Sequence, residues 1–273
     1  MAFSSDPERT QERVDQLRKY MTTNVDDGTN LVCGRQASCR ASIDETTIDF
    51  HGGQLMHVGK HYDLSDGYIP WRVLVVGLDT GRDDEHVTLE VRYEQLVRSM
   101  NLTFSGRNPH MRGTTSALRL GLGLPLGGDK RGEFVKLTNE AEPVHVMDTY
   151  AMTNVRLCSA KLEDSTKSQG TKVMSRNCFP HLQKTIEILE PDLCIFQSKG
   201  ARNELGALVK RRRPADGELE FVKIGSHETM LANFTHPSTP DGTHNWGVSA
   251  QTKYLLGTVE PTIAKARRYH FGR

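Results

Sequence analysis

The sequence lacks a long hydrophobic run. None of its apolar runs approaches the roughly 20 residues that a membrane-spanning helix needs. Its first stretch, MAFSSDPERTQERVDQ, is polar where a signal peptide would be apolar. With 273 residues, 36% hydrophobic and 25% charged, the composition suits a globular protein with one large domain or a domain plus extensions. We therefore expect a cytoplasmic protein without a membrane partner.

A strong excess of either charge is also lacking. The formal net charge is +1, so the chain as a whole does not have the basic character of a protein with a pI above about 9 that binds a polyanion. Two local basic segments stand out, the run KRRR at residues 210–213 and the C-terminal residues 265–273. Either can contact phosphate, although a solvated helix end is the more common explanation of such a run.

Cysteines are few and odd in number. Five cysteines without an export signal argue against a disulfide framework and favour a metal site or buried thiols. Cys194 lies in DLCIFQ, a predicted strand, and is interpreted as a small core residue. The other four occupy less regular segments or element boundaries: Cys33, Cys39, Cys158 and Cys178.

The remaining pattern alternates strands and helices, most clearly in the second half. This order predicts one sheet with helices on both faces, since a βαβ rhythm favours parallel strands. The region 51–70, rich in glycine, histidine and aspartate, is predicted to be a loop. We predict helices at 6–23, 86–100, 114–122, 175–191, 200–210 and 246–256, and strands at 71–76, 144–155, 192–197, 220–226 and 229–238.

Polar residues follow three predicted strands. Asp79 comes directly after the apolar run VLVVG, Asn154 ends a second strand, and His236 ends a late one. Parallel strands end at the same rim of a sheet, where ligands bind. An acid, an amide and an imidazole there can orient a water, bind a hydrogen-bonding edge and stabilise a negative leaving group. Taken singly, each has a plainer explanation, such as turn formation by Asp79.

These segments resemble the uracil-DNA glycosylase superfamily, over residues 33 to 246. The resemblance rests on the order of GLDTG, TNVRLC, NCFPHLQKTIEILEPDLCIFQSKGA and HPS, and the third stretch is similar to the iron-sulfur (family 4-like) branch. It implies an α/β three-layer sandwich with a central, mainly parallel four-stranded sheet flanked by helices. It also implies a helical extension at 1–30, a glycosylase domain at 31–273, and a monomer without an obligate protein partner.

The resemblance implies a monofunctional DNA glycosylase that flips out a base, hydrolyses its N-glycosidic bond and leaves an abasic site, as in base-excision repair. Asp79 is third in GLDTG, where GQDPY-like motifs carry the catalytic acid, whereas the iron-sulfur branch has its acid second, at Leu78 here. His236 matches the histidine that donates to the pyrimidine O2. Asn154 matches the asparagine that reads the Watson–Crick edge.

The resemblance also suggests how the base is held. Gly77 and Gly81 flank the catalytic acid and allow the base to approach closely, while His110 or Phe104 would stack on it. Some uracil-specific members carry a bulky ring after the acid, where this chain has Thr80 and Gly81. The alternative substrate is therefore a C5-modified cytosine, such as the glucosylated hydroxymethylcytosine of phage DNA, and the alternative role is phage defence.

DNA contacts are expected mainly in the loop PSTPDGTHNWG. This loop corresponds to the one that the family inserts into the minor groove, and it supplies Ser238, His244 and Asn245. Trp246 is either a wedge or a core residue, and we favour the core. Lys199 is expected to contact phosphate near the start of a helix.

The four cysteines outside DLCIFQ match the order of the ligands in the iron-sulfur branch. Cys33, Cys39, Cys158 and Cys178 are thus implied ligands of a [4Fe-4S] cluster, which requires four thiolates. The spacing of Cys33 and Cys39 is wider than usual there. A zinc site with four thiolate ligands and four unrelated buried thiols remain alternatives. Alternatives for the whole chain are an inactive nucleic-acid-binding module and a small-molecule nucleotide hydrolase.

Overall fold

A seven-stranded, mostly parallel sheet forms the centre of the protein. The computed structural model describes residues 2–43, 48–80, 84–128, 130–162 and 169–272. The strand order is β12-β13-β14-β11-β6-β9-β3, and the four middle strands run parallel. These four strands are β14 (His227–Asn233), β11 (Leu193–Phe196), β6 (Val73–Gly77) and β9 (Tyr150–Asn154).

Antiparallel strands widen the sheet at both edges. β12 (Lys210–Asp216) and β13 (Leu219–Ile224) continue it beyond β14, and β3 (His57–Val58) pairs with β9 at the other edge. The links within the β12–β13–β14 meander are too short for a crossover connection, so these strands must be antiparallel. The four-stranded sheet expected from the sequence thus corresponds to the parallel centre of a wider mixed sheet.

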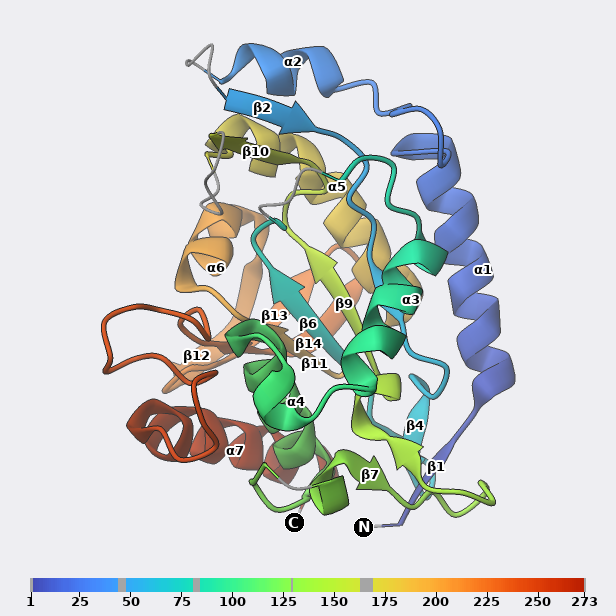
Figure 1. Ribbon diagram of the computed structural model, residues 1–273, viewed down its shortest axis with the longest axis vertical. Helices are drawn as coiled ribbons and strands as arrows, with labels where there is room; N and C mark the ends of the chain where they lie inside the picture. Colours follow the sequence, from blue (N-terminus) through green and yellow to red (C-terminus); the bar gives the residue numbers. More distant parts are fainter. Residues whose placement is uncertain (1, 44–47, 81–83, 129, 163–168, 273) are drawn as a thin grey trace.

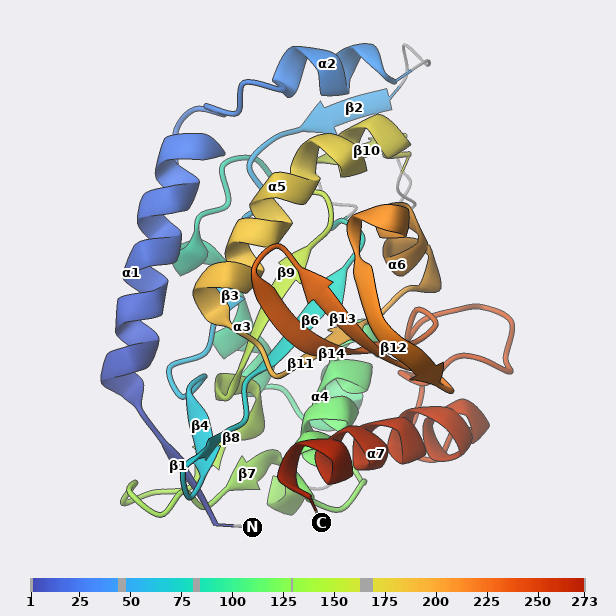
Figure 2. The same cartoon turned by 180° about the vertical axis from the view of Figure 1, so that it is seen from behind.

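Helices lie on both faces of the sheet (Figures 1 and 2). On one face α4 (Pro109–Leu122) packs against α7 (Glu260–Phe271). On the other, α5 (Lys172–Leu189) packs against α1 (Pro7–Asn24). The protein is therefore a mixed α/β protein compatible with a three-layer arrangement. No helix in the described ranges is long and apolar enough to cross a membrane.

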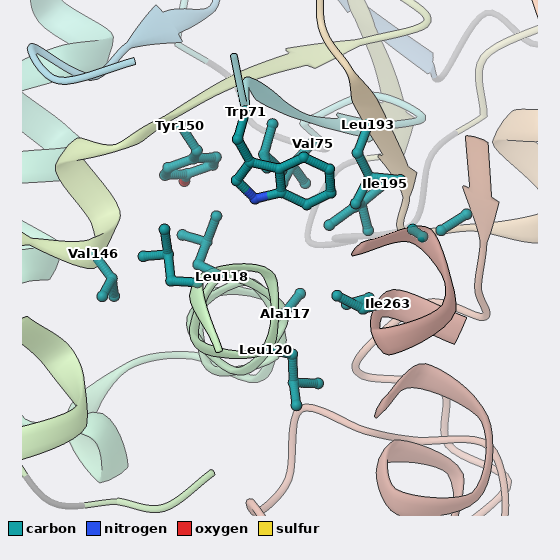
Figure 3. Close-up of a cluster of buried hydrophobic side chains, with 14 of the residues drawn as sticks. Trp71, Val75, Ala117, Leu118, Leu120, Val146, Tyr150, Leu193, Ile195 and Ile263 are labelled. Carbon is teal, nitrogen blue, oxygen red and sulfur yellow. The ribbon is translucent and has the colours of Figure 1, made fainter. Parts of the chain in front are cut away.

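The core on the α4 face joins the sheet to α4 and α7. Figure 3 shows Leu118 of α4 on the side of Tyr150 of β9, with Ile263 of α7 beside Ala117. Each such buried aliphatic side chain contributes about 1.5–3 kcal/mol relative to exposure. This packing fixes α4 over the parallel strands.

The ends of α4 are set by its sequence. Asn108 Oδ1 accepts the Met111 backbone N–H at 2.9 Å, and Pro109 occupies the first helical turn. The helix ends at Gly123, whose φ of +73° lies in the left-handed region that glycine favours. The cap holds His110 at the beginning of the helix, beside the carboxyl ends of the strands.

The N-terminal residues pack onto the rest of the protein. Arg13 of α1 donates through Nε to Asp63 at 3.0 Å and through Nη2 to Glu190 at 2.8 Å. The division between an extension at 1–30 and a domain at 31–273 stays a prediction. The smaller elements are β1 (Phe3–Ser5), β2 (Ile48–His51), β4 (Leu64–Asp66), β5 (Ile69–Pro70), β7 (Phe134–Val135), β8 (Val144–His145), β10 (Ser159–Leu162), α2 (Gln36–Ala41), α3 (Leu89–Met100) and α6 (Lys199–Leu205).

Three predictions about local structure were wrong. The predicted loop 51–70 contains β3, β4 and β5. The predicted helix 246–256 is largely irregular, because the backbone N–H groups of Trp246 and Gly247 donate to the Pro237 carbonyl and not along a helix. The last helix comes later, as a π-helical turn, Leu255–Val259, followed by α7. The basic run 210–213 belongs to strand β12 and not to a helix, because pairing with β13 and stacking of Arg213 on Phe221 override helix propensity.

Candidate active site

A cavity of about 550 Å³ opens at the carboxyl ends of the parallel strands. It is lined by Gly77 at the end of β6, Asp79 after β6, Asn154 at the end of β9, His236 after β14 and His110 from α4. The three strand ends that the sequence singled out therefore meet in one cavity. Gly81, expected beside them, lies outside the described residues.

Gly77 and Asn154 are register partners on neighbouring strands. A Cβ atom added at Gly77 would lie 2.4 Å from Asn154 Oδ1. Only glycine therefore leaves room for the asparagine side chain in its present position. Asn154 is 7% exposed, so its amide faces a largely enclosed space in which a hydrogen-bonding ligand edge would be read without competition from bulk water.

Hydrogen bonds from Ser238 determine which ring nitrogen of a neutral His236 carries the proton. The Ser238 backbone N–H donates to His236 Nδ1 at 3.2 Å, and Ser238 Oγ lies 2.8 Å from the same nitrogen. Although His236 is exposed overall, partial desolvation of its ring lowers its pKa, which favours the neutral ring. A neutral imidazole that accepts at Nδ1 carries its proton on Nε2. His236 is thus prepared as a neutral hydrogen-bond donor.

His110 lies beside His236. The ring centroids are 5.7 Å apart and the rings are tilted by 34°. Burial lowers the pKa of His110 to about 4, and the neighbouring His236 acts in the same direction. Phe104, the alternative stacking residue, is buried elsewhere and is not among the lining residues. Of the two rings considered for stacking, the structure brings only His110 to the cavity.

Asp79 is held by an arginine that the sequence analysis missed. Arg156 Nη1 donates to Asp79 Oδ2 at 3.1 Å, and the two side chains are 3% and 4% exposed. Arg156 also donates to Ser175 Oγ at 2.8 Å and lies 3.4 Å from Glu204. The feature of the sequence that could have identified Arg156 is its position in TNVRLC, two residues after Asn154. Asp79 is the one carboxylate among the described lining residues of this cavity.

The four cysteines of interest lie in one neighbourhood. Cys39 and Cys158 belong to the same small apolar cluster. Burial raises the pKa of Cys158, with Cys178, Cys39 and Cys33 adding to it, and burial raises the pKa of Cys178 to about 12. Such mutual influence requires proximity. Cys194 is separate, 3.8 Å from Thr229 in the sheet.

Two backbone segments act on these thiols. The backbone of Gly53 acts to lower the pKa of Cys158 and that of Leu157 acts to lower the pKa of Cys178, each against the larger, opposite effect of burial. Both backbone effects favour sulfur that carries negative charge. Within the described ranges, no three His, Cys, Asp or Glu side chains are grouped closely enough to hold a metal ion. This does not bear on a four-iron cluster, whose thiolates stand farther apart than those around a single ion.

The residues expected to contact DNA are spread around the cavity. Ser238 lines it, whereas Lys199, His244 and Asn245 are not among its lining residues. Lys199 pairs with Glu218 at 2.7 Å, and His244 Nδ1 lies 2.7 Å from Asp241.

Trp246 is a core residue. It is fully buried, it packs against Phe234, and its Nε1 donates to the Thr235 carbonyl at 2.8 Å. The core interpretation is therefore confirmed for Trp246, and the loop that begins at Pro237 is anchored there.

Comparison with known proteins adds no family assignment. No protein-family model matches the sequence, and no curated protein matches it. The interpretation of the cavity therefore depends on its own residues.

Proposed function

We propose that the protein is a monofunctional DNA glycosylase with a uracil-DNA glycosylase-like fold, which extrudes a pyrimidine and hydrolyses its N-glycosidic bond. The observation that carries this proposal is the meeting of Asp79, Asn154 and His236 in one cavity at the carboxyl ends of parallel strands. Enzymes that act on a base must take it out of the stack into such a pocket.

Each of the three residues has a chemical role in the proposed reaction. The Asn154 amide pairs with the Watson–Crick edge of the extruded base. His236 Nε2–H donates to O2 as negative charge gathers on the departing base. Asp79 stabilises the cationic sugar and orients the water. The water oxygen bonds to C1′, and the C1′–N1 bond breaks with its electron pair going to the base. The proton that the water loses passes to the surrounding solvent, and the base leaves as the anion that His236 Nε2–H stabilises.

Other residues would hold the DNA and the cofactor. His110 would stack on the base, while Ser238, His244 and Asn245 would contact the DNA around it and Lys199 a phosphate. Cys33, Cys39, Cys158 and Cys178 would hold a [4Fe-4S] cluster, with zinc as the competing metal. When bound, this cluster would brace the chain and supply no redox step. The support for this cluster is the shared neighbourhood of the four thiols.

A C5-modified cytosine is the second candidate substrate, with phage defence as the corresponding role. The size of the cavity favours it, because about 550 Å³ falls within the range of roughly 300–1,000 Å³ typical of sites for drug-sized ligands and exceeds the needs of a bare pyrimidine. Thr80, which also lines the cavity, is smaller than the aromatic ring of uracil-specific relatives.

The test uses duplexes that contain uracil, hypoxanthine, 5-hydroxymethylcytosine or its glucosylated form, followed by alkali to cleave abasic sites. We expect cleavage with at least one pyrimidine and a large loss of cleavage with Asp79→Asn. Asp15→Asn, which alters an exposed carboxylate on α1, serves as the control and should leave cleavage unchanged. Binding without cleavage of any duplex would instead identify an inactive nucleic-acid-binding module.

A further inference from the structure

The cavity continues along the sheet beyond Asn154. Met152 precedes Asn154 by two residues on β9, so both side chains lie on the same face of the sheet. His57 of the edge strand β3 is the register partner of Met152. Register partners point to the same side of a sheet. Asn154, Met152 and His57 therefore form a continuous floor, and all three line the cavity.

His57 is a buried polar side chain without a partner for one ring nitrogen. It is 3% exposed, and its Nε2 has no hydrogen-bond partner among the residues that the structure describes. Its ring packs edge-on against Tyr150, with centroids 5.0 Å apart. Burial lowers the pKa of His57 to about 3, and the nearby Arg92 acts in the same direction, so the ring is neutral. Native proteins rarely leave such a group unsatisfied without a functional reason.

The walls around this end of the cavity combine fixed polar groups with apolar surface. Arg92 of α3 donates to Gln95 Oε1 at 2.8 Å, to Gln54 Oε1 at 2.9 Å and to the Leu55 carbonyl at 3.1 Å. These bonds hold Arg92 and Gln95, which line the cavity together with the apolar Met152. A neutral imidazole beside such walls suits a neutral ligand group that can both donate and accept hydrogen bonds, as a hydroxyl does.

We propose that His57 determines substrate specificity by hydrogen-bonding a neutral, hydroxyl-bearing substituent of the extruded base that extends past Asn154 along the floor of the cavity. This inference depends on the proposed glycosylase function for its substrate. It adds that the end of the cavity at His57 recognises the substituent, whereas the end at Asp79, Asn154 and His236 carries out the chemistry.

The test compares wild type with His57→Leu, which preserves bulk and removes both ring nitrogens. On a duplex with a hydroxyl-bearing C5 substituent, we expect a loss of about 10- to 100-fold in excision, the effect of one lost hydrogen bond in a buried site. On uracil, which ends near Asn154, excision should change little. His57→Gln retains a donor and an acceptor and should recover part of the loss. Equal losses on both bases, or none, would overturn the inference.

Two further measurements keep the inference testable if no duplex is cleaved. Without ligand, His57→Leu should melt no lower than wild type, because it removes an unpartnered polar atom. The free nucleosides of 5-hydroxymethylcytosine and its glucosylated form should bind wild type and bind His57→Leu at least 10-fold more weakly. If no duplex is cleaved but the nucleosides bind in this pattern, the proposed glycosylase function is refuted and the role of His57 in binding the hydroxyl-bearing substituent is retained. Equal binding by both proteins, or none by wild type, refutes the role of His57.

Discussion

Arg156 donates to the Asp79 carboxylate at 3.1 Å, and both side chains are buried. Charge-assisted hydrogen bonds of this kind hold a carboxylate in a fixed orientation. In the proposed reaction, Asp79 is therefore held in position to face the sugar and to orient a water. Arg156 also donates to Ser175 of α5, the helix that contains Cys178. The pair therefore connects the residues after β6 with this helix.

Two acidic neighbours of Arg156 in the described part of the chain, Asp79 and Glu204, offer a matched comparison. Asp79→Asn should lower the excision rate by about 100- to 10,000-fold, because the variant keeps its shape but loses the charge that opposes the cationic sugar. Glu204→Gln alters a second carboxylate near Arg156, and Glu204 is not among the described lining residues of the cavity. Single-turnover excision assays should therefore show a large loss for the first variant only. Similar losses for both would mean that Asp79 acts through the ion pair alone.

Gly77→Ala should impair excision without unfolding the protein. The new Cβ would lie 2.4 Å from Asn154 Oδ1, so the amide must move away from its place in the cavity. We expect at least a 10-fold loss in excision, measured together with the melting temperature. Gly121→Ala on α4 is the control, because the nearest atom to its added Cβ is 3.7 Å away and alanine favours a helix. Comparable activity losses in the two variants would refute the close-approach argument.

The sequence predicted the parallel centre of the fold and the residues at its rim, for a physical reason. Buried parallel strands are nearly continuous apolar runs, and their polar ends are visible in VLVVGLD, as in TYAMTN and ANFTH. It did not predict β3 or β12, because a two-residue strand and a basic edge strand depend on pairing with distant residues. Arg156 and His57 were missed for the same reason, since their roles arise only from partners far along the chain.

Stability should fall as the pH drops below about 6.5. The pKa of His110 is about 4 in the folded protein, against 6.5 for an ordinary histidine, so the unfolded chain binds more protons between these values. The stabilisation is fully present above about pH 6.5 and is lost progressively towards pH 4. Melting temperatures over this range should decline less steeply for His110→Asn. The melting temperature of this variant should still decline somewhat with falling pH, because burial also lowers the pKa of His57 and His145. An identical slope in the variant would refute this assignment.

Cysteine variants should distinguish a cluster from isolated thiols. If Cys158 binds iron, anaerobically purified protein should be brown, and Cys158→Ser should lose the broad visible absorption and most of the bound iron. Cys194→Ser is the matched control, because that thiol is equally buried but lies in the sheet beside Thr229, apart from the other four. It should therefore keep its colour. The measurements are visible absorption and metal analysis, and they do not require activity. A colourless wild type that contains zinc would establish the competing site, and a metal-free wild type would leave the thiols a purely structural role.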